Sequence, residues 1–338
     1  MQPEDADPPF EPAPALGHRH VQTFWGRLTR PRLLVPLRRE TLPTPDGDEL
    51  ILDHLDGPAG APRVVLLHGL EGSSHSVYVQ GLFAQLRMRG LRGTALNFRS
   101  CARDLPDLGQ NIPNRTARLY HSGETTDLDH VLSHLASREP TAALGAVGVS
   151  LGGNVLLKWL GERPGQTRLA AAATISVPYD LEAGSRTLEK GLGPVYTGTF
   201  LRSLRRKARQ LLQRHPEAAG RFHVARMRSA RSFFEFDDAV TAPLHGFRDA
   251  KHYYDSSSSL NWVARITTPT LCLSAEDDPF LPAAALGRVA ANASGAVRLV
   301  ATRHGGHTGF IGGTSPFRVR YWAEERAVEF VAGRLSRA

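Results

Sequence analysis

The sequence predicts an α/β protein: a mostly parallel, doubly wound sheet with an inserted helical cap. Three observations lead to this prediction. Short apolar runs alternate with helical patterns along residues 63–177. The alternation stops over residues 179–262 and resumes at residue 269. A Gly-x-Ser-x-Gly segment at 148–152 joins one apolar run to a helical pattern. Repeated strand–helix units favour parallel strands with right-handed crossovers.

Turn signals and apolar spacing place the individual elements. Pro45-Asp46-Gly47-Asp48 is typical of a turn between two strands. Arg63–Leu67 is almost wholly apolar, as in a strand buried on both faces. The expected strands are residues 37–43, 49–54, 63–67, 94–98, 144–149, 170–177, 269–274 and 297–300, the last of these being the final strand. The expected helices are residues 77–89, 123–136, the segment that starts at Leu151, 282–291 and 321–335.

The chain divides into three parts. Residues 1–15 are rich in proline and acid and are expected to be a disordered tail. Residues 16–178 and 263–338 are expected to form the α/β core. Residues 179–262 carry helical, charged and aromatic pieces without a convincing parallel strand, which predicts a helical cap or lid over one end of the sheet.

Composition narrows the class of protein. The two cysteines, Cys101 and Cys272, provide no disulfide framework, which suits a reducing cytoplasm. The first 15 residues lack the basic and apolar regions of a signal peptide. No apolar run approaches the roughly 18–20 residues that span a bilayer. A cytoplasmic protein is therefore expected.

The positive charge is concentrated in one stretch. The net charge is +8, from 41 basic and 33 acidic residues. Residues 202–231 hold ten basic residues and one acidic residue, so this stretch alone accounts for the surplus. A solvated helical face is the simplest interpretation, and peripheral contact with an anionic membrane is the alternative. No recognition motif accompanies the charge, so no nucleic acid is expected as a partner.

The segment Gly148-Val149-Ser150-Leu151-Gly152 places a serine at a predicted strand-to-helix turn. A serine hydroxyl is a weak nucleophile, so it must be exposed, aimed and supplied with a base. A tight turn lifts Oγ out of the sheet, and the two glycines leave room for the packed backbone. The motif is also typical of a turn with a helix-capping serine. An acid and then a histidine downstream favour catalysis.

The expected catalytic triad is Ser150, Asp278 and His307. His307 is expected to act as general base, because the glycines before it let its loop return over the sheet. His304 is the rival base, with local packing as its alternative role. Asp277 is the rival acid. Neighbouring side chains of an extended segment point in opposite directions, so only one of the two carboxylates can orient the imidazole.

The remaining polar residues near these strand ends receive supporting roles. The backbone N–H groups of Leu70 and Leu151 are expected to form the oxyanion hole. His68 is expected to support its loop without transferring protons. Cys101 is expected to be a small buried side chain, not a second nucleophile. A metal site at His304-x-x-His307 needs a third ligand, so neither a metal nor a cofactor is expected.

Several motifs, the serine turn among them, carry a family resemblance. They are His20-Val21-Gln22-Thr23, His68–Gly72, Asn97-Phe98-Arg99, Tyr120–Glu124, Gly148–Asn154, Glu235–Asp238, Asp277–Phe280 and His304–Phe310. On these motifs the chain resembles α/β hydrolases of the YheT-like and EMB8-like branch, which are related to animal abhydrolase-domain lipid hydrolases. The resemblance implies a carboxylesterase-like Ser-Asp-His hydrolase with a helical cap, and its triad falls on Ser150, Asp278 and His307. The chain departs from the family at Ser100-Cys101-Ala102-Arg103, where relatives tend to carry Gly-Cys-Ser. The departure affects what the resemblance implies about the acyl pocket and leaves the implied chemistry unchanged.

The sequence therefore predicts a cofactor-independent hydrolase of carboxylic esters with apolar or lipid-like acyl groups, acting through an acyl-enzyme. Acyl transfer to another alcohol by the same triad is one alternative. A lipid- or partner-binding protein on a non-catalytic scaffold is another. The small-molecule ester is the expected partner in the first interpretation.

Overall fold

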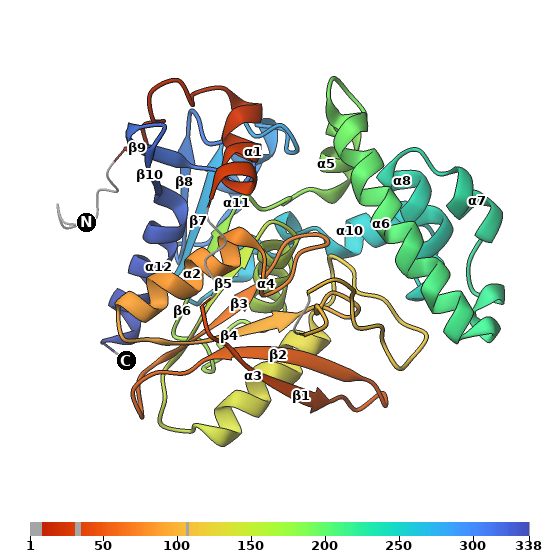
Figure 1. Cartoon of the computed structure of the whole chain (residues 1–338), viewed down its shortest axis with the longest axis horizontal. Helices are drawn as coiled ribbons and strands as arrows, with labels where there is room; N and C mark the ends of the chain where they lie inside the picture. Colours follow the sequence, from red (N-terminus) through yellow and green to blue (C-terminus); the bar gives the residue numbers. More distant parts are fainter. Residues whose placement is uncertain (1–8, 31–34, 106–107, 338) are drawn as a thin grey trace.

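An eight-stranded sheet forms the centre of the protein (Figure 1). The computed structural model describes residues 9–30, 35–105 and 108–337. The strands of the sheet are β1 (Arg38–Pro43), β2 (Glu49–Leu55), β3 (Arg63–Leu67), β4 (Arg92–Asn97), β5 (Leu144–Val149), β6 (Ala171–Ile175), β7 (Thr270–Ala275) and β8 (Val297–Thr302). Their order across the sheet is β1-β2-β4-β3-β5-β6-β7-β8.

The predicted, mostly parallel sheet is confirmed. The pairs β1–β2 and β2–β4 are antiparallel, and the neighbours from β4 to β8 are parallel. Parallel strands put their carboxyl ends at one edge, where open α/β sheets bind their ligands. The register aligns Gly148 of β5 with Leu67 of β3 and with Thr174 of β6. The residues that follow these strands therefore lie close together.

Helices cover both faces of the sheet. They are α2 (Val77–Met88), α3 (Thr126–Arg138), α4 (Leu151–Glu162), α11 (Ala284–Asn292) and α12 (Trp322–Leu335). Side chains of β3 alternate between two apolar cores: Val64 and Leu66 pack with α2 and α12, while Val65 and Leu67 pack with α3 and α4. A strand buried on both faces needs apolar residues at every position, which explains the uninterrupted apolar run.

The N-terminal segment packs on the core more closely than predicted. The chain forms a helix here, α1 (Arg19–Thr29), which was not among the expected helices. Phe10 contacts Phe310 and Trp322, and the Ala13 N–H donates to the Ile311 carbonyl at 3.0 Å. The expectation of a disordered tail over residues 1–15 is therefore wrong for residues 9–15. Its remaining part, residues 1–8, lies outside the described residues.

Two further predictions about elements need correction. Strand 297–300 is not the last, because a hairpin of β9 (Ile311–Ser315) and β10 (Arg318–Tyr321) follows it. The short strands and adjacent glycines of this hairpin hide its pattern. The helix expected from residue 123 begins at Thr126, because the side chains of His121 and Glu124 accept the N–H groups of Gly123 and Thr126.

Between β6 and β7 the described chain is helical and contributes nothing to the sheet. Its helices are α5 (Leu181–Thr187), α6 (Gly193–Arg214), η2 (Pro216–Gly220), α7 (Val224–Ser229), α8 (Phe233–Phe236), η3 (Asp237–Thr241), α9 (Ala242–Leu244), α10 (Ala250–Ser257), η4 (Ser259–Asn261) and η5 (Val263–Arg265). We call residues 179–262 the insertion. Figure 1 shows α6 to α8 on one side of the sheet, with α6 as their longest member. The insertion has an apolar core, which includes Leu201, Met227 and Phe236.

The described helices include none with the length and apolar character needed to cross a membrane.

A carboxyl group inside the insertion makes its stability depend on pH. Asp237 accepts hydrogen bonds from the Thr241 hydroxyl (2.6 Å) and the Tyr254 hydroxyl (2.7 Å). Burial raises the pKa of Asp237 from 3.8 to about 6. The folded protein therefore binds this proton more tightly than the unfolded chain, so the stabilisation is complete below pH 3.8 and is lost as the pH rises through about 6.

We expect Asp237→Asn to remove this pH dependence. Between pH 4 and pH 7.5 the wild-type protein should lose up to about 3 kcal/mol of unfolding free energy through Asp237, and the variant should not. The variant should therefore become more stable relative to wild type as the pH rises. Urea unfolding at a series of pH values measures the difference. Asp255→Asn, at an exposed carboxylate of α10, controls for the lost negative charge. A difference between Asp237→Asn and wild type that stays constant with pH would contradict the prediction.

Candidate active site

Ser150 lies at the sharp turn between β5 and α4. Its φ is 53° and its ψ is −120°, an unfavourable conformation for a residue with a Cβ, and its N–H donates to the Ile175 carbonyl at 2.8 Å. A Cβ on Gly148 would lie 2.6 Å from the Gly152 carbonyl oxygen, and one on Gly152 would lie 2.5 Å from the Leu67 carbonyl oxygen. Only glycine fits at both positions, so the turn requires the spacing seen in the sequence.

The structure brings the three predicted side chains together. His307 Nε2 lies 3.0 Å from Ser150 Oγ, and His307 Nδ1 lies 2.9 Å from Asp278 Oδ2. The carboxyl group of Asp278 is buried, and its Oδ1 accepts the Phe280 N–H at 2.8 Å. The Asp278 carboxylate accepts a hydrogen bond from Nδ1–H, which leaves Nε2 free to accept the Ser150 hydroxyl proton.

The rival residues lie in other contacts. Asp277 Oδ1 accepts the Gly306 N–H at 2.9 Å, and its Oδ2 lies 3.4 Å from His304 Nδ1. The His304 side chain is 41% exposed, whereas that of His307 is 10% exposed. Asp277 therefore shapes the loop that carries His307, while Asp278 contacts the imidazole itself.

Sequence analysis missed two hydroxyl groups that position the histidine loop. The His307 N–H donates to Thr23 Oγ1 of α1 at 3.0 Å, and the Thr308 N–H donates to Ser176 Oγ at 3.0 Å. Thr308 has a φ of 63°, so this loop needs such anchors. Thr23 is part of a motif that pointed to the family, but no signal in the sequence placed α1 beside a loop almost 300 residues away.

The two predicted oxyanion donors flank the serine. Leu151 is the first residue of α4, where a backbone N–H has no partner within the helix. Among the described residues, the Leu70 N–H donates to no other protein atom. A Cβ on the neighbouring Gly69 would lie 3.2 Å from Ser150 Cβ, so this loop packs directly against the serine. Both N–H groups are thus open to an oxygen atom near Ser150.

His68 supports the same loop, as predicted. Its Nε2 accepts the Phe98 N–H at 3.1 Å, so its Nδ1–H donates to the Gly69 carbonyl at 2.7 Å. Burial lowers the pKa of His68 to about 4, so the ring is neutral near pH 7. Both ring nitrogens bind backbone, which leaves neither for proton transfer.

Cys101 is unsuited to nucleophilic attack. The side chain is buried, and burial raises the pKa of the thiol to about 11. Its Sγ lies 3.0 Å from Nζ of Lys207, an ammonium group that cannot accept the thiol proton. The prediction of a small buried side chain agrees with this environment.

Aromatic rings extend from the imidazole toward α1 and α6. The Phe280 ring stacks on His307 with 4.3 Å between centroids, and Tyr196 lies 4.8 Å from Phe280. Phe24 stacks on Tyr196 at 5.2 Å, and Phe200 lies 6.3 Å from Phe280. We call Phe24, Tyr196, Phe200 and Phe280 the aromatic cluster. Sequence analysis gave these residues no role, although Phe280 belongs to the segment that contains Asp278.

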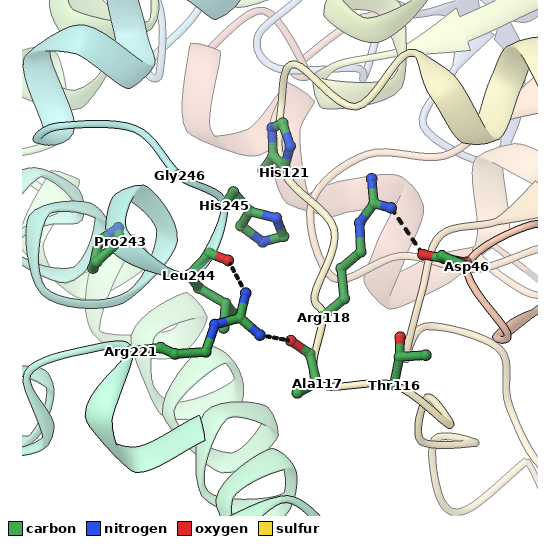
Figure 2. A pocket seen from close by; sticks show the side chains of 10 residues that line it. All are labelled: Asp46, Thr116, Ala117, Arg118, His121, Arg221, Pro243, Leu244, His245 and Gly246. Carbon is green, nitrogen blue, oxygen red and sulfur yellow. Dashed lines mark hydrogen bonds and ion pairs between the residues drawn. The ribbon is translucent and has the colours of Figure 1, made fainter. Parts of the chain in front are cut away.

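A cavity of about 470 Å³ lies elsewhere, between the loop at residues 116–121 and the insertion at residues 243–246 (Figure 2). Arg221 bridges the two sides by donating to the Leu244 carbonyl (2.6 Å) and the Ala117 carbonyl (3.1 Å). Its lining includes neither Ser150 nor His307 and contains no paired nucleophile and base. We therefore place the candidate active site at the serine turn.

Comparison with known proteins agrees with this fold. Residues 62–314 match the family model described as alpha/beta hydrolase fold. Putative esterase YheT of Escherichia coli (strain K12) is 37% identical over 325 residues, covering 95% of this chain and 92% of that protein. Phospholipase ABHD3 of Bos taurus is 34% identical over 300 residues, covering 85% of this chain and 70% of that protein.

A solved structure shows the same architecture at low identity. The Pyrococcus furiosus esterase Pf2001 superposes with a TM-score of 0.55 at 15% sequence identity, covering 90% of this chain and 93% of the other. At this identity the likeness concerns the fold alone. Together with the family match and the two relatives, it shows that the chain belongs to the α/β-hydrolase fold family, in the branch that contains YheT.

Proposed function

We propose that the protein is a serine hydrolase that cleaves carboxylic esters through an acyl-enzyme, with Ser150, Asp278 and His307 as its catalytic triad. The observation that carries this proposal is the continuous contact from Ser150 Oγ through the imidazole to the buried carboxylate of Asp278. The order of these residues along the chain is the one found in α/β hydrolases. The names of two relatives, an esterase and a phospholipase, agree with ester hydrolysis.

The proposed reaction has two halves. His307 Nε2 takes the Ser150 proton as Oγ attacks the ester carbonyl, which forms a tetrahedral oxyanion. When this intermediate collapses, the bond to the alcohol oxygen breaks, and the imidazolium returns the proton to that oxygen. Water then attacks the acyl-enzyme by the same route and releases the acid. Asp278 stays ionised throughout and stabilises the imidazolium.

The backbone donors are proposed to stabilise the charge that develops on the carbonyl oxygen. Leu151 begins α4 directly after Ser150, the loop before Leu70 packs against Ser150, and the N-terminus of α4 adds the positive end of its dipole. Losing one such donor typically lowers kcat by about 10²–10³-fold. Their side chains take no part in this role.

The aromatic cluster favours an apolar acyl or alcohol group. Its rings form a chain of contacts that runs from His307 to α6 and α1, with Phe280 in the loop after β7. An apolar chain gains free energy by leaving water for such a surface. We propose that the insertion acts as a cap whose helix α6 contributes Tyr196 and Phe200 to the substrate site.

Two other functions use the same structure. Acyl transfer to a second alcohol passes through the same acyl-enzyme, and product analysis in the presence of competing alcohols separates transfer from hydrolysis. A non-catalytic binding protein needs no aligned serine, imidazole and carboxylate, so the observed contacts favour an enzyme.

We expect a fluorophosphonate probe to label Ser150 of the wild-type protein. Ser150→Ala should abolish labelling and lower ester turnover by at least about 10⁴-fold, because the nucleophile is lost. In-gel fluorescence and peptide mass spectrometry measure the labelling. Ser133→Ala, at an exposed serine of α3, should be labelled like wild type. Wild-type protein that stays unlabelled under these conditions would contradict the proposal.

We expect Phe200→Ala to affect long acyl chains selectively. The variant should lose about tenfold in kcat/KM for an octanoyl ester, because apolar contact with the chain is lost, while kcat/KM for the acetyl ester stays within about twofold. Spectrophotometric assays with nitrophenyl octanoate and nitrophenyl acetate measure kcat/KM for the two chain lengths. Phe317→Ala removes a ring that is 94% exposed and serves as the control. Equal losses on both esters would refute an acyl-binding role.

The basic stretch offers a surface for an anionic membrane. Arg202, Arg206 and Arg209 are exposed on one face of α6, and none forms an ion pair with a carboxylate among the described residues. Val195, which lies about two helical turns before Arg202 on the same face, is 68% exposed. Arginines beside an exposed apolar residue suit a surface of anionic lipid. We propose peripheral binding there as a way to reach lipid-like esters.

We expect the protein to bind vesicles containing phosphatidylserine and to leave them at high salt. Replacing Arg202, Arg206 and Arg209 together by Gln should weaken binding by about 100-fold, since each arginine near an anionic surface contributes about 1 kcal/mol. Sedimentation with sucrose-loaded vesicles measures the bound fraction. The control replaces the exposed residues Arg87, Arg89 and Arg337 by Gln and should leave binding unchanged. Equal losses in the two triple variants would argue against a specific surface.

A further inference from the structure

Glu71, the residue directly after Leu70, has an unusual backbone. Its φ is 56°, in the left-handed region that is unfavourable for a residue with a Cβ. The turn is closed by the Gly72 N–H, which donates to the Gly69 carbonyl at 3.0 Å. Such a conformation persists only where its surroundings enforce it. The direction of the Leu70 N–H depends on this turn, so whatever restrains Glu71 also aims that donor.

Four contacts restrain Glu71. Its N–H donates to the Tyr120 hydroxyl at 2.8 Å, and that hydroxyl donates back to Glu71 Oε1 at 2.8 Å. The Lys207 ammonium donates to Oε1 at 2.7 Å, and the Ser203 hydroxyl donates to Oε2. Both the backbone and the carboxylate of Glu71 are therefore bound from outside the loop.

Two of these partners come from the insertion. Ser203 and Lys207 are four residues apart on α6, so they lie on the same face of that helix. The Lys207 side chain is 2% exposed and that of Glu71 is 9% exposed. A buried ammonium and a buried carboxylate each need the other, because an unpaired buried charge is strongly unfavourable. Seating of α6 on the core therefore fixes the turn beside Ser150.

We propose that Lys207 is a positioning residue for the oxyanion hole: through its ion pair with Glu71, helix α6 of the insertion sets the direction of the Leu70 N–H. The inference rests on the proposed function, because it assigns a support to one of the proposed backbone donors. It also couples the cap to the chemistry. With α6 seated, the donor points at the reacting carbonyl; with α6 displaced, Glu71 loses the contacts that enforce its backbone.

The test compares an ester with its thionoester, in which sulfur replaces the carbonyl oxygen. Sulfur is a larger and weaker hydrogen-bond acceptor, so a well-aimed oxyanion hole favours the oxygen ester. We expect Lys207→Met to lower kcat for 4-nitrophenyl butyrate by about tenfold or more, with KM nearly unchanged. The preference for the ester over its thionoester should fall by a similar factor. A role limited to the stability of the insertion, with the Leu70 N–H still in place, would leave this preference unchanged.

Three further variants complete the experiment. Glu71→Gln should reduce the preference as Lys207→Met does, and the double variant should lose no more than the worse single variant, because the two residues act as one unit. Lys158→Met, at a lysine paired with Glu162 on α4, is the matched control and should keep the preference. If Lys207→Met does not fold, Ser203→Ala carries the test with an expected loss of about two- to fivefold.

The outcomes separate this inference from the proposed function. Wild type that hydrolyses neither compound overturns both. Wild type that prefers the ester, together with folded Lys207→Met and Glu71→Gln variants that keep the full preference, overturns the positioning role alone. A lost preference in these variants, with the preference of Lys158→Met intact, supports it.

Discussion

The contact between Ser150 Oγ and His307 Nε2 is the interaction on which the proposed chemistry depends. The two residues are 157 positions apart, and their 3.0 Å separation has to be produced by the whole sheet. The strained turn after β5 presents the serine, and the loop after β8 presents the histidine. Each backbone is unfavourable by itself, so close-packed glycines and anchoring hydroxyl groups are needed to keep both in place.

Much of this arrangement could be predicted from the sequence. Strands buried on both faces need unbroken apolar runs, so β3 and β5 were visible as patterns. The serine, the acid and the histidine follow three predicted strands in the order expected for such a sheet. Because parallel strands end at one edge, their convergence followed from topology alone. The choice between Asp277 and Asp278 depended on side-chain direction, which the structure supplied.

The contacts that support the site could not be predicted in this way. Thr23, Glu71 and Lys207 act through tertiary packing between segments that are distant in the chain, and no periodicity encodes it. The helix α1 was not among the expected helices, and the hairpin after β8 was hidden by short strands with glycines. In each case a local pattern was too short to show which part of the core it would contact.

The insertion contributes both to the proposed substrate site and to the contacts that support it. One part of α6 contributes aromatic rings beside Phe280, which stacks on His307, and another part contributes a buried ammonium beside Glu71. The same helix therefore contacts the proposed substrate site and the proposed oxyanion loop. Its outer face carries the exposed arginines. Substrate entry, charge stabilisation and surface binding are thus proposed to depend on the position of one helix.

A crystal structure of the protein after reaction with a dialkyl fluorophosphate tests the central proposal most directly. We expect phosphorus bonded to Ser150 Oγ, with the phosphoryl oxygen within about 3 Å of the Leu70 and Leu151 N–H groups. His307 should remain in contact with Asp278. Phosphorus on another residue, or a phosphoryl oxygen turned away from both N–H groups, would contradict it.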